Sequence, residues 1–315
     1  MNKIKCIHCG NKNIIKKGKQ KNLREVKQRY YCKDCRKRFV FSWLIGKKYN
    51  VSVIINALSY YNLGNNTYQS SKLVNRQFKV KVSNSIVCVW INEFKRLCPY
   101  YKIRDKVINE YGKNIIASKL FKHNGLTYNY KYHKAKIDFL DKEFNELVKY
   151  LKRIEEDFPH EFFDINKRCS QLKMKLDGIE NIDRKKSYAS DLARFSVGAA
   201  RNDYLRHKVI EEFMLINDVC TVAIEVPIWF WDKRWKKGIC GHIDILQTRG
   251  NKIYILDYKP NAISENLSKV CSQLFFYAKG ISFRTGIKLK DIRCAWFDDK
   301  DYFEFQPEKI FRKSE

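Results

Sequence analysis

Two aspartates and a lysine lie in a segment, residues 241–259, whose pattern predicts a β-hairpin. Apolar, β-prone runs flank Gly250-Asn251, which is a favourable two-residue hairpin turn. A turn centred there places Asp244 opposite Asp257, about 5 Å apart at Cβ. Because successive strand residues alternate faces, Asp257 and Lys259 share one face. The hairpin therefore presents two carboxylates and one ammonium group together.

Two adjacent carboxylates repel each other, and a cation between them favours the ionised forms. Mg²⁺ or Mn²⁺ accepts carboxylate oxygens and keeps positions open for water and phosphate. Such an ion polarises a phosphoryl oxygen, and a neighbouring lysine such as Lys259 orients the attacking water. The alternative is a surface hairpin whose charges face solvent.

Two further pairs of polar residues are spaced one helical turn apart. His207 and Glu211 lie in a segment with a helical pattern from Asp191 to Leu215, and an isolated pair of this kind is more often solvated than metal-bound. Gln273 and Tyr277 lie in a second apolar helical segment, where a tyrosine that faces the core is the simpler interpretation.

These motifs together resemble the PD-(D/E)XK nuclease superfamily, and within it the RecB-like branch that includes CRISPR-adaptation nucleases. That branch carries a helical His, a Gly-x-x-Asp strand, an Asp/Glu-x-Lys strand and a Gln-x-x-x-Tyr helix. The four motifs occur here in the same order, as His207, Gly241 to Asp244, Asp257 to Lys259, and Gln273 to Tyr277. The resemblance covers roughly residues 186–312.

The resemblance implies metal ligands and catalytic groups. The implied ligands of Mg²⁺ or Mn²⁺ are His207, Asp244, Asp257 and the Tyr258 carbonyl. The implied catalytic residues are Asp244, Asp257, Lys259, Gln273 and Tyr277. Gln273 is expected near Lys259 or the scissile phosphate, and Tyr277 is expected to stack on or bond to the DNA strand.

Three other carboxylates are candidates for supporting roles. Glu211 or Glu212 is expected to support His207. Glu225 either reaches the same metal through water or is a strand-edge carboxylate.

The composition of the chain favours a polyanion-binding protein. The formal net charge is +29, and residues 1–110 hold 25 Lys and Arg against 5 Asp and Glu. No run approaches a membrane span, and the N-terminus lacks the apolar region of a signal peptide. The 11 cysteines are therefore expected in a reducing, cytoplasmic environment, where metal binding is favoured over disulfides.

Two Cys-x-x-Cys pairs predict a zinc ribbon at residues 1–46. Cys6 and Cys9 precede Cys32 and Cys35, which is the spacing of a four-thiolate Zn²⁺ site. Redox or free thiols are the alternative, and His8 inside the first pair is a substitute ligand. The pattern resembles the zinc ribbon at the head of many insertion-sequence transposases.

Residues 50–100 predict a helix-turn-helix. A helical segment over 51–61 is followed by one that Ser70 or Ser71 would cap and that ends at Phe78, and by one over 84–97 capped by Ser83. The start of the third helix, Ser83, Asn84 and Ser85, would enter the major groove, with Val89 as a further candidate. A helical spacer without groove contact is the alternative.

Residues 101–185 predict a helical connector, with a helical period over 137–158, and residues 186–315 predict the nuclease domain. Strands over 292–297 and 302–305 would complete a mixed sheet of four or five strands between helices. The expected fold is multidomain: zinc ribbon, helical helix-turn-helix and α/β restriction-endonuclease-like domain. Cys169, Cys220, Cys240, Cys271 and Cys294 are scattered, so no iron–sulfur cluster is expected.

The predicted function is a Mg²⁺- or Mn²⁺-dependent deoxyribonuclease targeted to DNA by its N-terminal head. The alternatives are a non-catalytic DNA-binding regulator and a transposition accessory protein. The expected partner is DNA rather than a membrane. Candidate protein partners are a second copy of the chain, through the connector, and a protein of a mobile element or a defence system.

Overall fold

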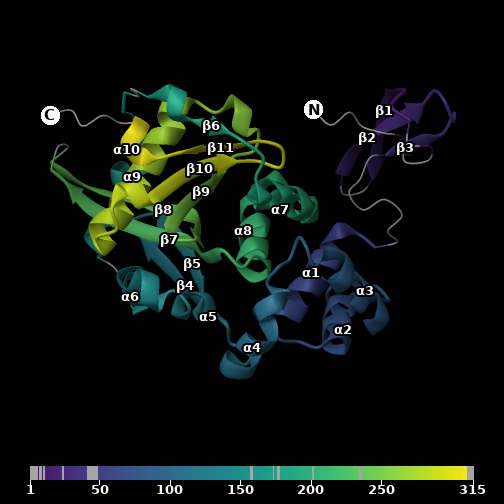
Figure 1. Ribbon diagram of the computed structural model, residues 1–315, viewed down its shortest axis with the longest axis horizontal. Coiled ribbons are helices and arrows are strands. Elements are labelled where there is room, and N and C mark those ends of the chain that lie inside the picture. The colour runs from purple at the N-terminus through teal and green to yellow at the C-terminus, as the bar shows by residue number, and fades with distance from the viewer. Residues whose placement is uncertain are drawn as a thin grey trace. The chain divides into compact units, whose positions relative to one another are not determined.

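The computed structural model divides the chain into two compact units, Met1–Val51 and Ser52–Glu315 (Figure 1). The described residues are 6, 9, 11–22, 25–40, 49–156, 159–172, 174–175, 178–200, 202–233 and 236–310.

The N-terminal unit contains a three-stranded antiparallel sheet in the order β1-β2-β3. Its strands are β1 (Ile14–Asn22), β2 (Glu25–Cys32) and β3 (Arg38–Val40). The buried residues of this small core are Cys6, Cys32 and Phe39. A sheet of this size buries little apolar surface, and domains below about 70–80 residues often depend on a metal or disulfides for stability. The cysteine cluster described below could supply such a cross-link by binding a metal.

A set of helices opens the larger unit. These are α1 (Val51–Asn62), α2 (Thr67–Phe78), α3 (Asn84–Phe94) and α4 (Tyr101–Tyr111). The predicted cap of the third helix is confirmed, because Ser83 Oγ accepts a hydrogen bond from the Ile86 amide at 3.3 Å. This helix ends at Phe94, three residues before its predicted end at Leu97.

The predicted cap of α2 is wrong. Asn66 caps the helix, and the Asn66 and Gln69 side chains each accept a hydrogen bond from the other residue's amide. This capping box starts the helix earlier than predicted and leaves Ser70 and Ser71 buried inside it.

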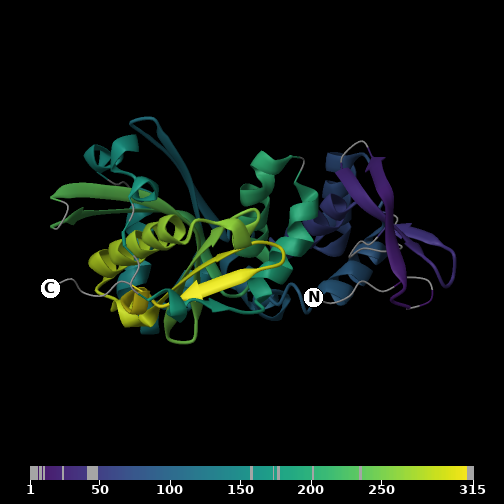
Figure 2. The same cartoon turned by 90° about the horizontal axis from the view of Figure 1, so that it is seen from above.

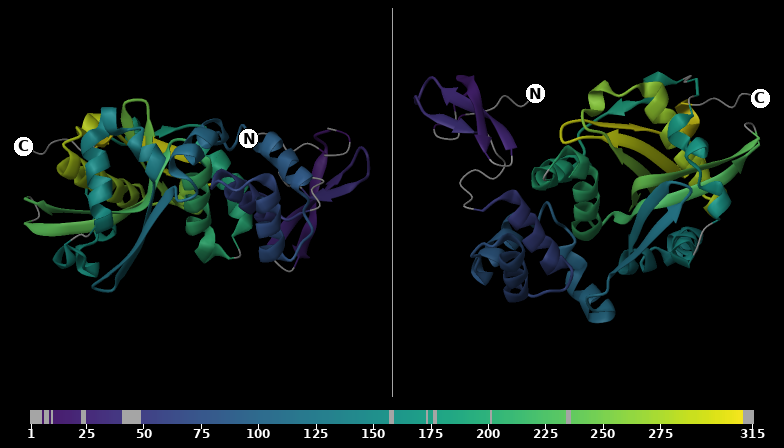
Figure 3. Two further views of the ribbon diagram at one scale, coloured as in Figure 1. Left: turned by 90° about the horizontal axis from the view of Figure 1, so that it is seen from below. Right: turned by 180° about the vertical axis from the view of Figure 1, so that it is seen from behind.

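Helix α1 packs on α8 (Arg206–Asn217) and α3 packs on α7 (Tyr188–Ser196), and α7 and α8 lie between these helices and the large sheet (Figure 3). The Asn62 amide donates to Asn217 Oδ1 at 2.8 Å, and both side chains are buried. The rings of Phe94 and Phe195 lie 4.7 Å apart. The predicted helix-turn-helix segment is therefore part of the larger unit's packing.

The larger unit is built on an eight-stranded mixed sheet in the order β4-β5-β7-β8-β9-β10-β11-β6. Its strands are β4 (Ile116–His123), β5 (Leu126–His133), β6 (Asp183–Arg184), β7 (Thr221–Asp232), β8 (Lys237–Arg249), β9 (Lys252–Tyr258), β10 (Ile292–Phe297) and β11 (Tyr302–Phe305). The paired strands are antiparallel except β9 and β10, which are parallel. The predicted mixed sheet is confirmed, but it is larger than four or five strands.

The description of residues 101–185 as a helical connector is wrong for the hairpin β4–β5, which forms one edge of the large sheet (Figure 2). Asn124 and Gly125 both have positive φ angles, 46° and 80°, as a tight hairpin turn requires. Tyr128, Tyr130 and Tyr132 alternate with more exposed residues and are buried. The helical part of the segment consists of α4, α5 (Lys134–Asp138), α6 (Asp141–Glu156) and several single-turn 3-10 helices.

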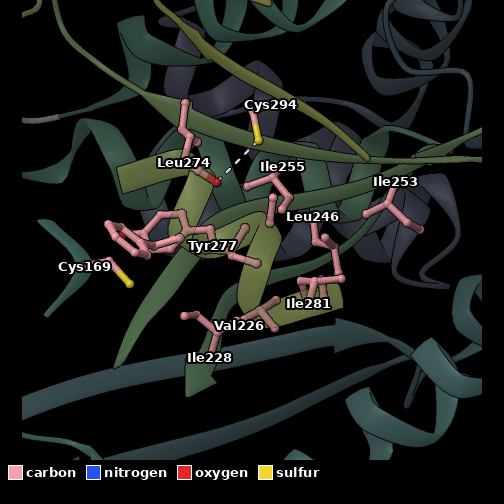
Figure 4. Packing of buried hydrophobic residues seen from close by; sticks show 14 of the residues in the cluster. Cys169, Val226, Ile228, Leu246, Ile253, Ile255, Leu274, Tyr277, Ile281 and Cys294 are labelled. Carbon is pink, nitrogen blue, oxygen red and sulfur yellow. Dashed lines mark hydrogen bonds between the residues drawn. The ribbon is translucent and has the colours of Figure 1, made fainter. Parts of the chain in front are cut away.

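The core of the larger unit lies between the sheet and α9 (Leu267–Thr285), which connects β9 to β10; the short α10 (Pro307–Ile310) follows β11. Figure 4 shows Leu274 and Tyr277 of α9 among the apolar side chains of β7, β8 and β9. The Cys294 thiol donates to the Leu274 carbonyl at 3.4 Å. In the part of the chain that the structure describes, no helix combines the length and apolar character needed to span a bilayer.

Candidate active site

A cavity of about 780 Å³ opens where α8, β8 and the end of β9 meet. Its lining residues come from strands, helices and connecting turns: Arg168, Ser170, Tyr204, Leu205, His207, Lys208, Glu225, His242, Asp244, Lys259, Pro260, Glu265, Lys269, Val270 and Gln273. A cavity of this size that combines convergent polar groups with apolar walls is typical of a ligand site.

The two predicted aspartates come together, and Asp244 lines this cavity while Asp257 is buried beside Asp244. The register of β8 and β9 is the one predicted, since Arg249 pairs with Lys252 and Ile245 pairs with Leu256. The next position along the two strands brings Asp244 beside Asp257, and their side chains interact. Asp244 is only 6% exposed and Asp257 only 1%.

Burial and repulsion separate the acidities of these carboxyl groups. Burial raises the pKa of Asp257 well above its usual value, and the negative charge of Asp244 raises it further. Burial also acts to raise the pKa of Asp244, but His207, His242 and other neighbours together hold it below its usual value. Without a cation, Asp257 is therefore the aspartate that retains a proton.

His207 and Glu211 of α8 complete a group of potential metal ligands with Asp244. His207 Nδ1 lies 3.5 Å from Asp244 Oδ2 and 4.0 Å from Glu211 Oε1. The ligand atoms of the three residues all lie within 4.8 Å of one another. In an octahedral site with ligands at 2.0–2.1 Å, neighbouring ligand atoms lie about 3 Å apart. Small side-chain adjustments would therefore bring these atoms to coordination distance.

The state of Glu211 also fits a cation. This residue is buried, and its Oε1 atom has no hydrogen-bond partner among the described residues. Burial raises the pKa of Glu211 well above its usual value, and the charge of Asp244 contributes. Such an oxygen gains a partner when a metal binds. The other candidate, Glu212, is instead paired with Lys131, so Glu211 is the better supporting ligand.

Lys259 reaches the same centre. Its Nζ atom lies 2.9 Å from Asp257 Oδ2. Burial acts to lower the pKa of Lys259, but Asp257 and Asp244 outweigh it and raise the pKa, so the ammonium stays charged. Tyr258 lies between Asp257 and Lys259 along the chain, and its ring centroid lies 5.1 Å from that of His207. The role of the Tyr258 carbonyl as a metal ligand stays a prediction.

Gln273 and Tyr277 have different positions. Gln273 lines the cavity, and its amide donates to the Tyr277 hydroxyl at 2.8 Å. Tyr277 is only 1% exposed, so the expectation that its ring stacks on DNA is wrong. The ring packs under β8 instead, and its hydroxyl orients Gln273.

Gly241 explains how closely the parts of the site are packed. A Cβ atom at this position would lie 2.7 Å from Tyr277 Cε1 and 3.1 Å from Cys169 Sγ. Figure 4 shows Tyr277 and Cys169 side by side. The glycine of the Gly-x-x-Asp motif therefore lets α9 and the turn at Cys169 approach the strand that carries Asp244.

His242 and Arg168 line the cavity but were not predicted from the sequence, whereas Glu225 was predicted with two alternative roles. His242 Nε2 lies 3.7 Å from both Asp244 Oδ1 and Glu225 Oε2, and Arg168 Nη2 lies 3.5 Å from His242 Nδ1. His242 was detectable, because it alternates with Asp244 along one strand. Arg168 had no local signal. Glu225 has a φ of 50°, which a non-glycine residue rarely adopts, and its side chain lines the cavity.

The four cysteines of the N-terminal unit form a second candidate metal site. The sulfurs of Cys6 and Cys35 lie 3.5 Å apart, those of Cys9 and Cys32 lie 3.6 Å apart, and all four lie within 4.8 Å of one another. Zinc–sulfur bonds of 2.3 Å in a tetrahedron place sulfurs about 3.8 Å apart. The cluster could therefore bind a metal such as zinc, as a zinc ribbon requires, and His8 lies outside the described residues.

Main-chain groups support the two cysteine turns. The amide of Asn11 donates to the Cys9 sulfur, and that of Lys37 donates to the Cys35 sulfur. The Cys32 amide in turn donates to the Lys37 carbonyl at 3.0 Å. These hydrogen bonds to sulfur favour the thiolate form that metal binding needs, but in the absence of a metal, burial and neighbouring thiols still raise the pKa of Cys9 and of Cys35 overall.

The predicted groove-contacting residues lie at the surface of the larger unit. Ser83, Asn84 and Ser85 are all exposed at the start of α3, and Val89 is exposed one turn further on. Lys79, the C-cap residue that follows α2, has a φ of 53°, so the chain turns sharply between the two helices. The exposure leaves these side chains available to a ligand.

Comparisons of the chain with protein-family models, curated proteins and solved structures each found no match.

Proposed function

We propose that the protein is a metal-dependent DNA nuclease that hydrolyses phosphodiester bonds and is targeted to DNA by its N-terminal zinc ribbon and helix-turn-helix. The observation that carries the proposal is that His207, Asp244 and Lys259 line one cavity, with two buried carboxyl groups in contact with them. Glu211 groups with His207 and Asp244, and Asp257 pairs with Lys259. Buried carboxyl groups that exceed the nearby cations favour binding of a divalent ion.

In this proposal, His207, Asp244, Asp257 and the Tyr258 carbonyl hold Mg²⁺ or Mn²⁺, and Glu211 supports them. When bound, the ion polarises a phosphoryl oxygen and lowers the pKa of a bound water. Lys259 orients the attacking water for in-line attack and balances charge on the pentavalent phosphorus. Gln273, held by Tyr277, lines the same cavity as Lys259. The products carry a 5′-phosphate and a 3′-hydroxyl.

The wall of the cavity also suits a nucleic acid strand. Lys208 and Lys269 line it and can bind backbone phosphates. Tyr204 is 90% exposed on the same wall and offers its ring to a nucleobase. The Cys6, Cys9, Cys32 and Cys35 site would fold the ribbon, and Ser83, Asn84 and Ser85 would contact the major groove.

The test is cleavage of supercoiled plasmid and of linear single- and double-stranded DNA with Mg²⁺ or Mn²⁺. Wild type is compared with Asp257→Asn and Lys259→Met, and with Glu146→Gln, which changes an exposed carboxylate on α6. Cleavage by wild type and Glu146→Gln alone supports the proposal. DNA binding without cleavage by any of the four proteins would instead favour a regulator.

A further inference from the structure

Arg168 is held in a fixed position beside β8. It lies between two single-turn 3-10 helices, Ile165–Lys167 and Cys169–Gln171, and forms a parallel bridge with Cys240. The next residue, Cys169, is fully buried and would contact a Cβ atom at Gly241. The main chain at Arg168 is therefore tied to the strand that carries Asp244.

The side chain of Arg168 lines the cavity, and its hydrogen-bonding capacity is largely unused. Nη2 approaches His242 Nδ1 at 3.5 Å. The Nε atom is buried and has no hydrogen-bond partner among the described residues. A guanidinium has five N–H donors, and a buried donor left unpaired is destabilising. The guanidinium therefore has unused donors that could bind an acceptor in the cavity.

Charge compensation for Glu225 is the simpler explanation of this arginine. The two side chains are close enough for Arg168 to act on the acidity of Glu225. However, across the described residues no carboxylate lies within ion-pair distance of Arg168, whereas Lys259 forms such a pair with Asp257. His242 already faces Glu225 at 3.7 Å. A residue whose role was to neutralise Glu225 would be expected to contact it directly.

We propose that Arg168 binds a backbone phosphate of the substrate strand inside the cavity, through two parallel N–H···O bonds. The inference rests on the proposed function and names a substrate-binding residue for it. A guanidinium matches two phosphate oxygens at once, and this two-point contact fixes orientation as well as distance. Since the cavity also holds the candidate metal centre, Arg168 would position the phosphate next to the one that is hydrolysed.

The experiment measures binding rather than cleavage. Single-stranded oligonucleotides that each carry one neutral methylphosphonate, at successive positions, are titrated with full-length wild type and Arg168→Met in Ca²⁺. At one position, we expect the neutral linkage to weaken binding by wild type about tenfold or more. The same substitution should leave binding by Arg168→Met unchanged, because the contact is already lost.

Two further variants separate the contact from loss of charge or fold. Arg184→Met removes the same charge from an exposed arginine (side chain 57% exposed) that is paired with Asp301, and it should keep the wild-type methylphosphonate profile. Arg168→Lys keeps the charge but not the two-point contact and should show an intermediate effect. If Arg168→Met is unfolded by circular dichroism, Arg168→Lys alone serves as the test.

The proposal is overturned if no methylphosphonate position distinguishes the Arg168 variants from wild type. This result is independent of the proposed catalysis, which is judged by cleavage of unmodified DNA in Mn²⁺. A protein that shows the coupling but does not cleave would keep Arg168 as a phosphate contact and lose the nuclease assignment.

Discussion

At the level of single residues, the cavity combines groups that oppose folding in the absence of a cation. Glu211 and Asp257 are buried, and burial raises the pKa of each. Buried carboxyl groups of this kind reduce stability and persist where a function requires them. The strained φ of Glu225 lies at the same cavity. Buried carboxyl groups and a strained residue at one cavity are together typical of a ligand site, which is the basis of the proposed metal binding.

Asp257→Asn should make the metal-free protein less sensitive to pH. With a folded-state pKa above the usual value of about 3.9, the unfolded chain releases the Asp257 proton first, so stability falls as pH rises above that value. Asparagine does not titrate, so the variant should lose less stability between pH 5 and pH 8 in EDTA. Urea unfolding measures both slopes, and equal slopes would contradict the assignment of the raised pKa.

The same variant tests metal binding without any cleavage assay. Mn²⁺ at about 100 times its dissociation constant should stabilise wild type by about 2.7 kcal/mol. Asp257→Asn should gain much less, while Glu146→Gln should gain as much as wild type. A manganese effect of equal size in all three proteins would place the ion elsewhere.

At the level of elements, the spacing between β8 and α9 depends on Gly241. Gly241→Ala places a methyl group 2.7 Å from the Tyr277 ring, so Tyr277 and Gln273 must move. We expect a loss of about 1–3 kcal/mol of stability and a fall in activity. Gly238→Ala, whose Cβ would meet Phe162 at 3.2 Å, is the milder comparison away from the cavity. Wild-type activity in Gly241→Ala would show that this spacing does not position the site.

Lys136 joins α5 to the end of α8 and the start of β7. It is buried and donates to the carbonyls of Leu215 at 2.5 Å, Thr221 at 3.0 Å and Asp218. Lys136→Met leaves three buried acceptors without this donor and should cost about 3 kcal/mol or more.

The cost of Lys136→Met should depend on pH. Burial lowers the pKa of Lys136 to about 7, whereas the unfolded chain keeps its proton up to about pH 10.4. Between these values the unfolded state binds more protons, so the stability that Lys136 contributes rises with pH, by up to about 1.4 kcal/mol per unit. Urea unfolding at pH 7, 8 and 9 should therefore show a widening gap between wild type and Lys136→Met. A constant gap would mean that the lysine stays charged.

Whether a feature of these elements can be predicted from the sequence depends on whether neighbouring residues or distant ones determine it. The turn at Gly250-Asn251 and the cap at Ser83 depend on neighbouring residues, and both were predicted correctly. The hairpin turn at Asn124-Gly125 was equally local but was overlooked in a segment with a helical period further on. Arg168 could not have been predicted, because its position depends on a bridge to Cys240 in a distant strand.

At the level of the whole molecule, positive charge is denser in the smaller unit, and the candidate chemistry lies in the larger one. Residues 1–51 hold 16 Lys and Arg against 2 Asp and Glu, which is +14, whereas the remaining 264 residues carry the other +15. Lys16, Lys17 and Lys19 of β1 are exposed. The candidate catalytic carboxylates lie in the larger unit, where the field is more balanced. This distribution suits a protein whose N-terminal unit raises the affinity for DNA while the larger unit acts on it.

Loss of the cysteine cluster should therefore change the salt dependence of DNA binding. Six to ten phosphate contacts would lose roughly 10³–10⁵ in affinity between 50 and 200 mM salt. In the full chain, Cys9→Ser with Cys32→Ser removes two thiolates of the candidate zinc site, so the ribbon should unfold and the salt response should become shallower. Cys220→Ser, in the larger unit, should keep the wild-type response.

The larger unit should be unaffected, because its packing is separate from that of the ribbon. Its unfolding temperature, and any cleavage at low salt, should match wild type in the double variant. A binding titration at four salt concentrations measures the slope of DNA affinity against salt for wild type and the variants. An unchanged slope would mean that the DNA contacts lie on the helices α2 and α3 or around the cavity, and that the basic ribbon serves another purpose.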